Sequence, residues 1–480
     1  MLSDDILYLP VRELGLRIRK KTLSPVVLAE SYLERSRTLG PKFNAFVTLT
    51  PELAMEQARA AEKEIHAGHY RGPLHGIPYA AKDLVAVKGY PTTWGAPPFA
   101  DRKFDYNATV IEKLNAAGAV LLGKAAMIEL AGGLGYSNGN ASLTGPARNP
   151  WNTDCWTCGS SSGSGAIVSA ALAPWAIGSD TRGSIICPTT WCGISGMRPS
   201  FGRVSRYGAM TIAWSMDKLG PMARTADDCG LILSVIAGHD AKDHDSLPHG
   251  VAEYAHSGPP QRTSKGLRIG RLTNVWGRVE AKLEAAIDES FKALEKDGAK
   301  ISDAQAPEGP FEDAAELTIL IEAASAFQEL VKSGDCAKLR DPLGQVNGYS
   351  SQEFSATDYL QVQRVRKILQ ERMDKLFDQF DVVMAAGSNS PAQPLVPAPG
   401  GRGPRAAPSG PVVDNSNRAP DGISSLCGLP ALSVPCGFSE SNLPYGVQFI
   451  ARATEDHRVI SAARRFQAIT EWHRKRPAIG

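Results

Sequence analysis

The stretch "GSSSGSGAIVSAALAPWAIGSDTRGSI", from Gly159 to Ile185, places two serine-rich turns at either end of one short apolar segment. The pattern predicts a helix from about Ser164 to Leu172 and then a strand from Trp175 to Gly178. A helix followed by a strand returns the chain to the same edge of a sheet. We therefore expect the first serine turn to face the second turn, which ends at Ser184.

The sequence on both sides of this stretch also alternates between strand and helix patterns, which is typical of an α/β fold. Strands are predicted at Gly76–Asp83, Ala119–Lys124, Leu267–Leu272, Ala431–Gly437 and Tyr445–Ala451, and helices at Thr109–Gly118, Val279–Gly298 and residues 457–471. A further helix is predicted to begin after Ser24, because Pro25 suits the first helical turn.

We expect one domain over residues 1–480, because no segment requires a split into independent units. Within it, residues 1–70 are expected to be mainly helical, residues 76–230 to form the core of the site, and residues 260–480 to complete the sheet and its helices. A proline- and glycine-rich segment, Ser390 to Pro411, predicts a long surface loop.

Composition excludes several classes of protein. The net charge is only +2, from 52 basic and 50 acidic residues, so nucleic acid and anionic membranes are not expected partners. The N-terminal segment has no signal-peptide pattern, and no apolar run approaches the roughly 18 residues of a membrane span. We expect a cytoplasmic protein with a small-molecule substrate, and a homodimer is the oligomer to test.

The cysteines do not suggest a disulfide framework, because there are only eight in a long chain. The segment "CWTC", from Cys155 to Cys158, has the spacing of a redox or metal motif. No second pair and no histidine cluster accompany it, so we expect neither a metal nor a cofactor.

Gly/Ser clusters are usually flexible turns, and three functional motifs fit the first turn poorly. A phosphate-binding loop needs a lysine, which is absent here. A dinucleotide fingerprint needs an acidic residue at a later strand end, but Asp180 lies inside the second turn. "GSSSG" matches the string of an α/β-hydrolase elbow, but no suitable Asp and His follow it.

The pairing of the two turns favours nucleophilic catalysis. Unpaired N–H groups at the start of a helix suit an oxyanion, and Ser184 precedes such a helix start. A serine nucleophile needs a base, and no histidine lies near either turn. Lys82 stands at the end of an apolar strand, where burial makes the neutral amine accessible. The residues therefore predict a proton path from serine through serine to Lys82.

These residues lie in motifs that resemble the amidase signature family. The motifs occur in the order "GIPYAAKD", "GPARNPW", "GSSSGSG", "GSDTRGSI", "CGISGMRPSFGRVSRYGAM" and "DKLGPMARTADD". The resemblance implies one α/β domain with a mixed, twisted sheet covered by helices on both faces. It also implies a Ser–cis-Ser–Lys triad, in which Lys82 is the base, Ser160 follows a cis peptide bond, and Ser184 is the nucleophile.

The resemblance further assigns the oxyanion hole to the backbone N–H groups of Thr181, Arg182, Gly183 and Ser184. Gly132 matches a position whose backbone commonly faces the substrate. The triad chemistry needs no metal or cofactor. The implied activity is hydrolysis of a carboxylic amide, or of a related ester, carbamate or acyl urea, through an acyl-enzyme.

The sequence departs from the family pattern at a few positions. Cys158 and Arg182 replace glycines, Ser162 replaces a further residue of the first turn, and Ile186 replaces a common arginine. If the Arg182 side chain reaches the substrate pocket, it favours acyl groups that carry a carboxylate. The alternative is that Arg182 points to solvent or pairs with a structural acid.

Two other functions remain open. One is the glutamine-hydrolysing subunit of a tRNA-dependent amidotransferase, which typically carries Ala-Arg-Tyr/Phe-Asp-Gly-Val-Arg; the comparable stretch here, Ile321 to Gly334, lacks it. The other is a catalytically silent binding protein. Four side chains near the motifs are either pocket-lining or core residues: Tyr136, Trp191, Met210 and Trp214.

Overall fold

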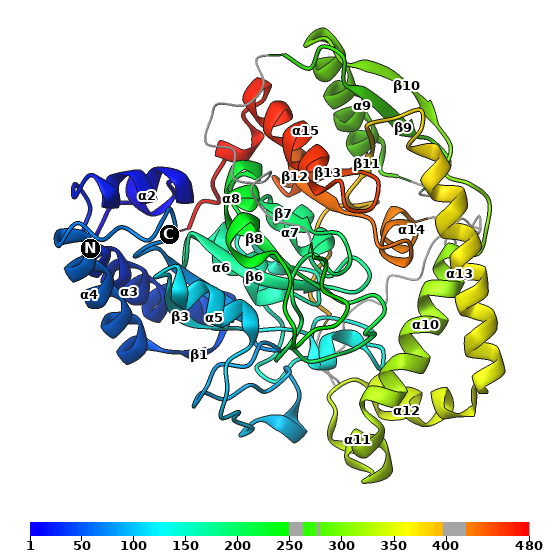
Figure 1. Ribbon diagram of the computed structural model, residues 1–480, viewed down its shortest axis with the longest axis horizontal. Helices are drawn as coiled ribbons and strands as arrows, with labels where there is room; N and C mark the ends of the chain where they lie inside the picture. The colour runs from blue at the N-terminus through cyan, green and yellow to red at the C-terminus, as the bar shows by residue number, and fades with distance from the viewer. Residues whose placement is uncertain (249–262, 276–278, 397–418, 480) are drawn as a thin grey trace.

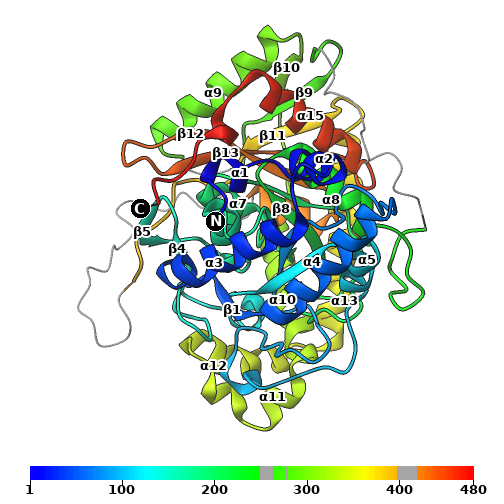
Figure 2. The same ribbon diagram turned by 90° about the vertical axis from the view of Figure 1, so that its left-hand side faces the viewer.

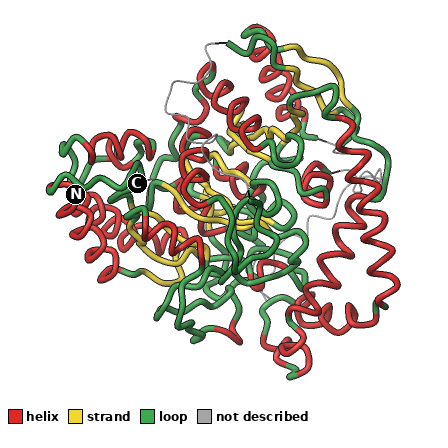
Figure 3. The backbone as a smooth tube through the Cα atoms, viewed as in Figure 1, coloured by secondary structure: helices red, strands yellow, loops and turns green. Residues whose placement is uncertain are grey.

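A sheet of 11 strands, in the order β1-β3-β2-β6-β8-β7-β12-β13-β11-β9-β10, runs through the middle of the molecule (Figures 1 and 3). The computed structural model describes residues 1–248, 263–275, 279–396 and 419–479. The strands are β1 (Phe46–Leu49), β2 (Pro78–Lys82), β3 (Val120–Ala125), β6 (Trp175–Asp180), β7 (Ser195–Arg198), β8 (Lys218–Ala223), β9 (Arg268–Leu272), β10 (Lys300–Ala304), β11 (Val382–Ala386), β12 (Ala431–Phe438) and β13 (Pro444–Ile450).

The sheet is mixed, as the resemblance implied. Strands β3, β2 and β6 are parallel neighbours, and so are β11, β9 and β10. The strands between these two groups pair antiparallel. A separate two-stranded ribbon, β4 (Arg148–Asn149) and β5 (Asn152–Trp156), lies just before the first serine turn.

Helices cover both faces of the sheet (Figures 1 and 2). They are α1 (Asp4–Leu7), α2 (Val11–Arg19), α3 (Pro25–Phe43), α4 (Pro51–His66), α5 (Thr109–Ala116), α6 (Ser162–Ser169), α7 (Ile186–Cys192), α8 (Ala226–Ile236), α9 (Ala281–Lys296), α10 (Phe311–Ala326), α11 (Gln328–Lys332), α12 (Pro342–Ser350), α13 (Ala356–Leu376), α14 (Pro420–Leu426) and α15 (Asp456–Ile469). The two ends of the chain lie near each other, where Arg476 pairs with Asp5 at 3.2 Å.

A large apolar core fills the space between the sheet and its helices. Tyr79 of β2 and Trp175 of β6 are fully buried and stack with their ring centroids 4.7 Å apart. This stack lies near the start of both strands, and each strand ends in a polar residue, Lys82 in β2 and Asp180 in β6. A second, small apolar cluster contains Cys155, Cys158, Cys187 and Trp191 and lies beside the serine turns.

The predicted elements are confirmed, with shifted ends. Helix α3 begins after Ser24, whose side chain accepts a hydrogen bond from the Val27 N–H. Helix α6 ends at Ser169, short of the predicted end, because the backbone turns left-handed at Ala171. Strand β6 continues to Asp180 because β8 pairs with it that far.

Most of the predicted loop at 390–411 lies outside the described residues. Among the residues that are described, no helix is long and apolar enough to cross a membrane.

Candidate active site

The parallel pairing of β2 and β6 brings the two serine turns to one edge of the sheet. Lys82 is the last residue of β2, and the second turn follows β6 directly. The first turn leads into α6, which packs against both strands. The peptide bond between Gly159 and Ser160 is cis, as the resemblance implied. The structure therefore gathers Lys82, Ser160 and the second turn from distant parts of the sequence.

The Lys82 amine hydrogen-bonds with three hydroxyl groups. Its Nζ lies 2.7 Å from Ser160 Oγ, 3.0 Å from Ser161 Oγ and 2.8 Å from Ser179 Oγ. All four side chains are buried. The amine is thus held by two serines of the first turn and by one from the end of β6.

Burial lowers the pKa of Lys82 to about 7, because an ammonium group loses its hydration in the interior. The negative charges of Asp180 and Asp217 oppose this shift. The neighbouring Asp83 pairs instead with Lys124 at 2.9 Å. Near neutral pH a substantial fraction of Lys82 is therefore neutral and able to accept a proton.

Asp180 shapes the second turn. Its carboxylate accepts hydrogen bonds from the N–H groups of Gly183 at 2.8 Å and Ile185 at 2.7 Å. Burial alone would raise the pKa of Asp180, but Arg198, Lys218 and these N–H donors outweigh burial and hold the pKa below its usual range. The carboxylate is therefore ionised and fixes the backbone around Ser184.

This hydrogen bond also changes the expected set of oxyanion donors. The N–H of Gly183 points to Asp180, so it is already used within the turn. Of the four donors that the resemblance implied, the N–H groups of Thr181, Arg182 and Ser184 remain as candidates. The sequence pattern placed all four N–H groups on one turn, but it did not indicate which of them would donate a hydrogen bond to Asp180.

The two turns also contact each other directly. The Ser161 N–H donates to the carbonyl of Ser184 at 3.2 Å. Ser184 borders a cavity of about 220 Å³, which is also lined by Gly132, Thr181 and Arg182. The residues predicted for the site thus lie at this cavity, in the second turn beside it, or in the adjoining lysine–serine cluster.

Gly132 faces this cavity with a backbone that only glycine accommodates well. Its φ is +85°, and an added Cβ would lie 2.6 Å from the ring of Tyr136. Tyr136 also lines the cavity, whereas Met210 and Trp214 line a second cavity of about 170 Å³. Trp191 belongs to the small apolar cluster, and its indole N–H donates to Ser388. Of these four side chains, Tyr136 is the one that lines the Ser184 cavity.

The Arg182 side chain pairs with acids of helix α10. Its guanidinium lies 2.5 Å from a carboxylate oxygen of Glu316 and 3.4 Å from one of Glu312. Burial raises the pKa of Glu312 to about 7, although Arg182 works against that shift. Arg182 therefore both lines the Ser184 cavity and pairs with acids of the protein.

The structure contains a disulfide that the sequence did not predict. Cys158 and Cys187 form this bond, whereas the cysteine count had argued only against a disulfide framework. The two residues are 29 positions apart in sequence, and the meeting of the two turns brings their Cα atoms to 5.9 Å. Cys155, the other member of "CWTC", is free and buried. Cysteine spacing alone could not reveal this pair, because the fold determines which turns meet.

Three residues of the site were not predicted from the sequence. Ser161 and Ser179 hold the Lys82 amine, and Asp217 accepts a hydrogen bond from the Thr181 hydroxyl at 2.7 Å. Ser161 lies in the first serine turn, and Ser179 lies at the end of the strand that follows. Both residues stand in the stretch from Gly159 to Ile185, so the sequence pattern could have pointed to them. Asp217 opens the quoted motif "DKLGPMARTADD", but its role could not be predicted, because only the pairing of β8 with β6 places it beside the second turn.

The fold and this buried lysine–serine cluster point to a class of enzymes that hydrolyse amides. The family model described as Amidase matches residues 27–460 of the chain. The chain therefore belongs to the Amidase family, known as the amidase signature enzymes.

Known members of the family include both components of larger complexes and separate amidases. A protein of Acinetobacter baumannii (strain AYE), named as a subunit of glutamyl-tRNA(Gln) amidotransferase, is 36% identical over 501 residues, covering 99% of each chain. A bacterial aryl acylamidase of known structure superposes with a TM-score of 0.86 at 26% identity, covering 97% of each chain. The peptide amidase of Stenotrophomonas maltophilia superposes with a TM-score of 0.84 at 27% identity, covering 98% of each chain.

Proposed function

We propose that this protein is an amidohydrolase that forms an acyl-enzyme on Ser184, with Ser160 and Lys82 as the proton relay. The observation that carries the proposal is the buried 2.7 Å contact between Lys82 Nζ and Ser160 Oγ, next to the turn that presents Ser184 to a cavity. A neutral buried amine beside a serine hydroxyl is the arrangement that a serine nucleophile without histidine requires.

In the proposed reaction, Ser184 Oγ attacks the carbonyl carbon of the amide. Its proton passes to Ser160 Oγ, and the Ser160 proton passes to Lys82 Nζ. The carbonyl oxygen becomes an oxyanion, which the N–H groups of Thr181, Arg182 and Ser184 stabilise. The proton then returns through Ser160 to the leaving nitrogen, and the C–N bond breaks. Water repeats the sequence on the acyl-enzyme and releases the acid.

The cavity beside Ser184 supports a small substrate. Its wall includes the apolar side chains of Ile212, Ile319 and Leu320, and the Arg182–Glu316 pair is its charged part. The family neighbours named aryl acylamidase and peptide amidase support an amide of this kind. Esters, carbamates and acyl ureas present the same carbonyl to Ser184, and no metal or cofactor enters the scheme.

The test is a panel of primary amides, anilides, esters and carbamates on the purified protein. We expect at least one class to be hydrolysed, and Ser184→Ala to lower kcat by about 10⁴-fold or more. Ser162→Ala is the matched control, because Ser162 is buried in the same first turn but has no part in the proposed relay. Activity retained by Ser184→Ala would refute the acyl-enzyme.

A second candidate is a component of a tRNA-dependent amidotransferase. Identity of 36% over 99% of the chain to a protein named as such a component favours it. In this case the chain would release ammonia from glutamine and would co-purify with other subunits. Glutamine hydrolysis that appears only in a complex pulled from the native host would favour this candidate over the separate amidase.

The cytoplasmic location, the single domain and the homodimer stay predictions. Cell fractionation tests the location, limited proteolysis of the purified chain tests the single domain, and light scattering tests the homodimer.

A further inference from the structure

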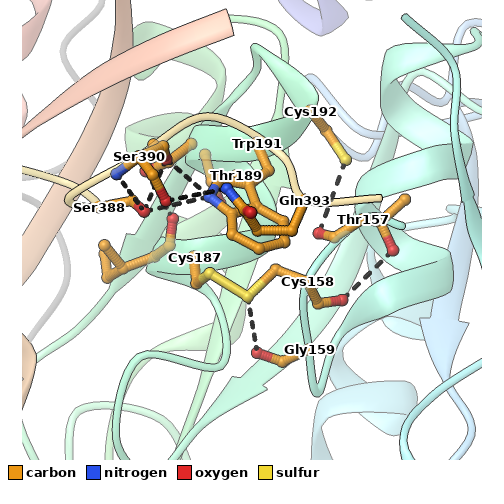
Figure 4. The surroundings of a disulfide bond; sticks show 12 residues. Thr157, Cys158, Gly159, Cys187, Thr189, Trp191, Cys192, Ser388, Ser390 and Gln393 are labelled. Atoms are coloured by element: carbon orange, nitrogen blue, oxygen red, sulfur yellow. Dashed lines mark hydrogen bonds between the residues drawn. A yellow bond between two sulfur atoms is a disulfide. The ribbon is translucent and has the colours of Figure 1, made fainter. Parts of the chain in front are cut away.

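The Cys158–Cys187 disulfide ties together the two turns that carry the proposed catalytic serines (Figure 4). Cys158 stands two residues before Ser160, and Cys187 stands three residues after Ser184. Cys187 lies in the first turn of α7, so the bond joins the entrance of α6 to the entrance of α7. Neither position needs a cysteine for the triad chemistry itself.

The backbones next to the disulfide are coupled to both serines. The Cys187 N–H donates to the carbonyl of Gly183 at 2.8 Å, and thereby holds the residue before Ser184. Cys158 has a φ of +64°, in the left-handed region that few residues other than glycine adopt. The cysteine therefore holds an unfavourable backbone conformation immediately before Gly159 and Ser160.

The noncovalent contacts that join the same segments are hydrogen bonds, each weaker than the covalent bond; Ser161 Oγ, for example, donates to the Ser179 carbonyl at 3.1 Å. The direct hydrogen bond between the turns, from the Ser161 N–H to the Ser184 carbonyl, is 3.2 Å long. The disulfide packs into the small apolar cluster with Trp191, as Figure 4 shows. Breaking the disulfide removes the covalent link and leaves Cys158 free to abandon its left-handed backbone.

Cys187 is the more exposed partner of the bond. It is half-buried, whereas Cys158 and the free thiol of Cys155 are buried. Attack by a reductant is therefore expected on the Cys187 side of the bond. Cys155 belongs to the same apolar cluster and provides a thiol that is not part of the bond.

We propose that the Cys158–Cys187 disulfide is a positioning element of the active site, and that reduction of this bond by a dithiol switches hydrolysis down. The proposal rests on the proposed function. The dithiol gives two electrons and two protons, the S–S bond becomes two thiols, and the dithiol becomes a disulfide. The two turns then lose their covalent tie and are joined by hydrogen bonds alone, so that Ser160 and Ser184 are less precisely aligned and the rate of acylation falls.

The test compares the oxidised and reduced wild-type protein, so it needs no variant that must fold. The protein is equilibrated at set ratios of reduced to oxidised dithiothreitol, and kcat and KM are measured on the best amide of the panel. Alkylation followed by peptide mass mapping reports the state of Cys158 and Cys187. We expect kcat to fall at least about tenfold with KM within about twofold, since alignment rather than binding is lost.

The fall should follow a two-electron transition, with about 30 mV for each tenfold change in the thiol ratio, and should reverse on reoxidation. The double variant Cys158→Ser with Cys187→Ser should have low kcat and no response to dithiothreitol. Cys155→Ser is the matched control and should keep both its activity and its response.

Two results would overturn the inference. One is wild-type protein that mass mapping shows to be fully reduced at Cys158 and Cys187 but that keeps its kcat. The other is a folded double serine variant with wild-type kcat. If the oxidised protein hydrolyses no substrate and Ser184 reacts with no acylating probe, the proposed function is wrong, and this inference, which rests on it, is wrong as well.

Discussion

Lys82 is fully buried among serine hydroxyls, and its environment decides which proton states the amine adopts. Three hydroxyl contacts replace the water that an exposed lysine would have, but they do not supply a full counter-charge. The nearby carboxylates of Asp180 and Asp217 only partly offset the loss of hydration. The residue is therefore suited to accept and return a proton, which an ion-paired lysine is not.

Lys82→Arg should be nearly as inactive as Lys82→Ala at every pH, with kcat lowered about 10³-fold or more. Arginine keeps the positive charge but does not give up its proton in the usable range. Steady-state kinetics from about pH 6 to about pH 10 check this. If Lys82 were only a fixed cation that holds Ser160, a folded arginine variant would keep a large part of the rate.

The pH dependence of kcat/KM should show an acid limb near pH 7. The pKa of Lys82 is lowered from 10.5 to about 7 in the folded protein, so the amine becomes neutral, and the enzyme active, as the pH rises through that value. Asp217→Asn should move the limb to lower pH, because the charge of Asp217 raises the pKa of Lys82. A profile that is flat from about pH 5 to about pH 9 would contradict the relay.

Arg182→Gly should change kcat/KM by similar factors, within about threefold of each other, for anionic and neutral amides of equal size. The guanidinium of Arg182 already forms ion pairs with Glu312 and Glu316, so we expect it to form no additional ion pair with an anionic substrate. Glu316→Gln is the companion variant, because it frees part of the guanidinium and should improve anionic amides selectively. If Arg182→Gly lowered kcat/KM for anionic amides alone, Arg182 would determine specificity for acyl groups that carry a carboxylate.

At the residue scale, the sequence predicted the site residues that stand in local motifs. It did not predict contacts that form only when distant segments meet in the fold. Lys82, Ser160 and Ser184 each stand in a recognisable motif, and the structure gathers them. The use of the Gly183 N–H by Asp180 and the joining of Cys158 to Cys187 depend on how two turns meet. Spacing along the chain does not contain that information.

At the scale of elements, β2 and β3 are joined by a buried ion pair. Lys124 of β3 lies 2.9 Å from Asp83, which follows β2, and neither side chain is exposed. The second oxygen of Asp83 accepts a hydrogen bond from the Thr93 N–H at 3.0 Å. The pair stands next to Lys82 in the chain and fixes the end of its strand.

Lys124→Met should lower the free energy of unfolding by roughly 3–5 kcal/mol, because it leaves the Asp83 carboxylate buried without its cation. Lys63→Met, on the outer face of α4, is the control and should stay within about 0.5 kcal/mol of the wild type. Urea unfolding followed by circular dichroism gives both values. Equal stability of the two variants would show that the buried pair is dispensable.

Element types were predictable because apolar periodicity and caps are local, as the Ser24 cap of α3 illustrates. The residues at which these elements end were harder to predict. The end of α6 depends on the left-handed backbone at Ala171, and the length of β6 depends on its partner β8. Both are set by tertiary contacts that a single segment does not reveal.

At the scale of the whole molecule, the mixed sheet was expected only through the family resemblance. The chain adds β11, β9 and β10 at one edge and β1 at the other, and this order does not follow sequence order. Strand order results from packing of segments hundreds of residues apart, so alternation of helices and strands indicates an α/β class without fixing the topology.

Hydrolysis should survive prolonged treatment with a strong chelator, with kcat within about twofold of the untreated protein. The relay and the oxyanion donors supply acid, base and charge stabilisation from protein groups alone. Residual metal is measured by elemental analysis of the same sample. Loss of turnover that zinc restores would refute a metal-independent mechanism.

The acyl-enzyme on Ser184 is the central claim, and its most direct measurement is reaction of the intact protein with a fluorophosphonate, followed by peptide mass mapping. We predict a single adduct on Ser184, a labelling rate that rises with pH through about 7, and a rate at least about 100-fold slower in Lys82→Arg. An adduct on another residue, or equal labelling rates in the wild type and in folded Lys82→Arg, would contradict the account.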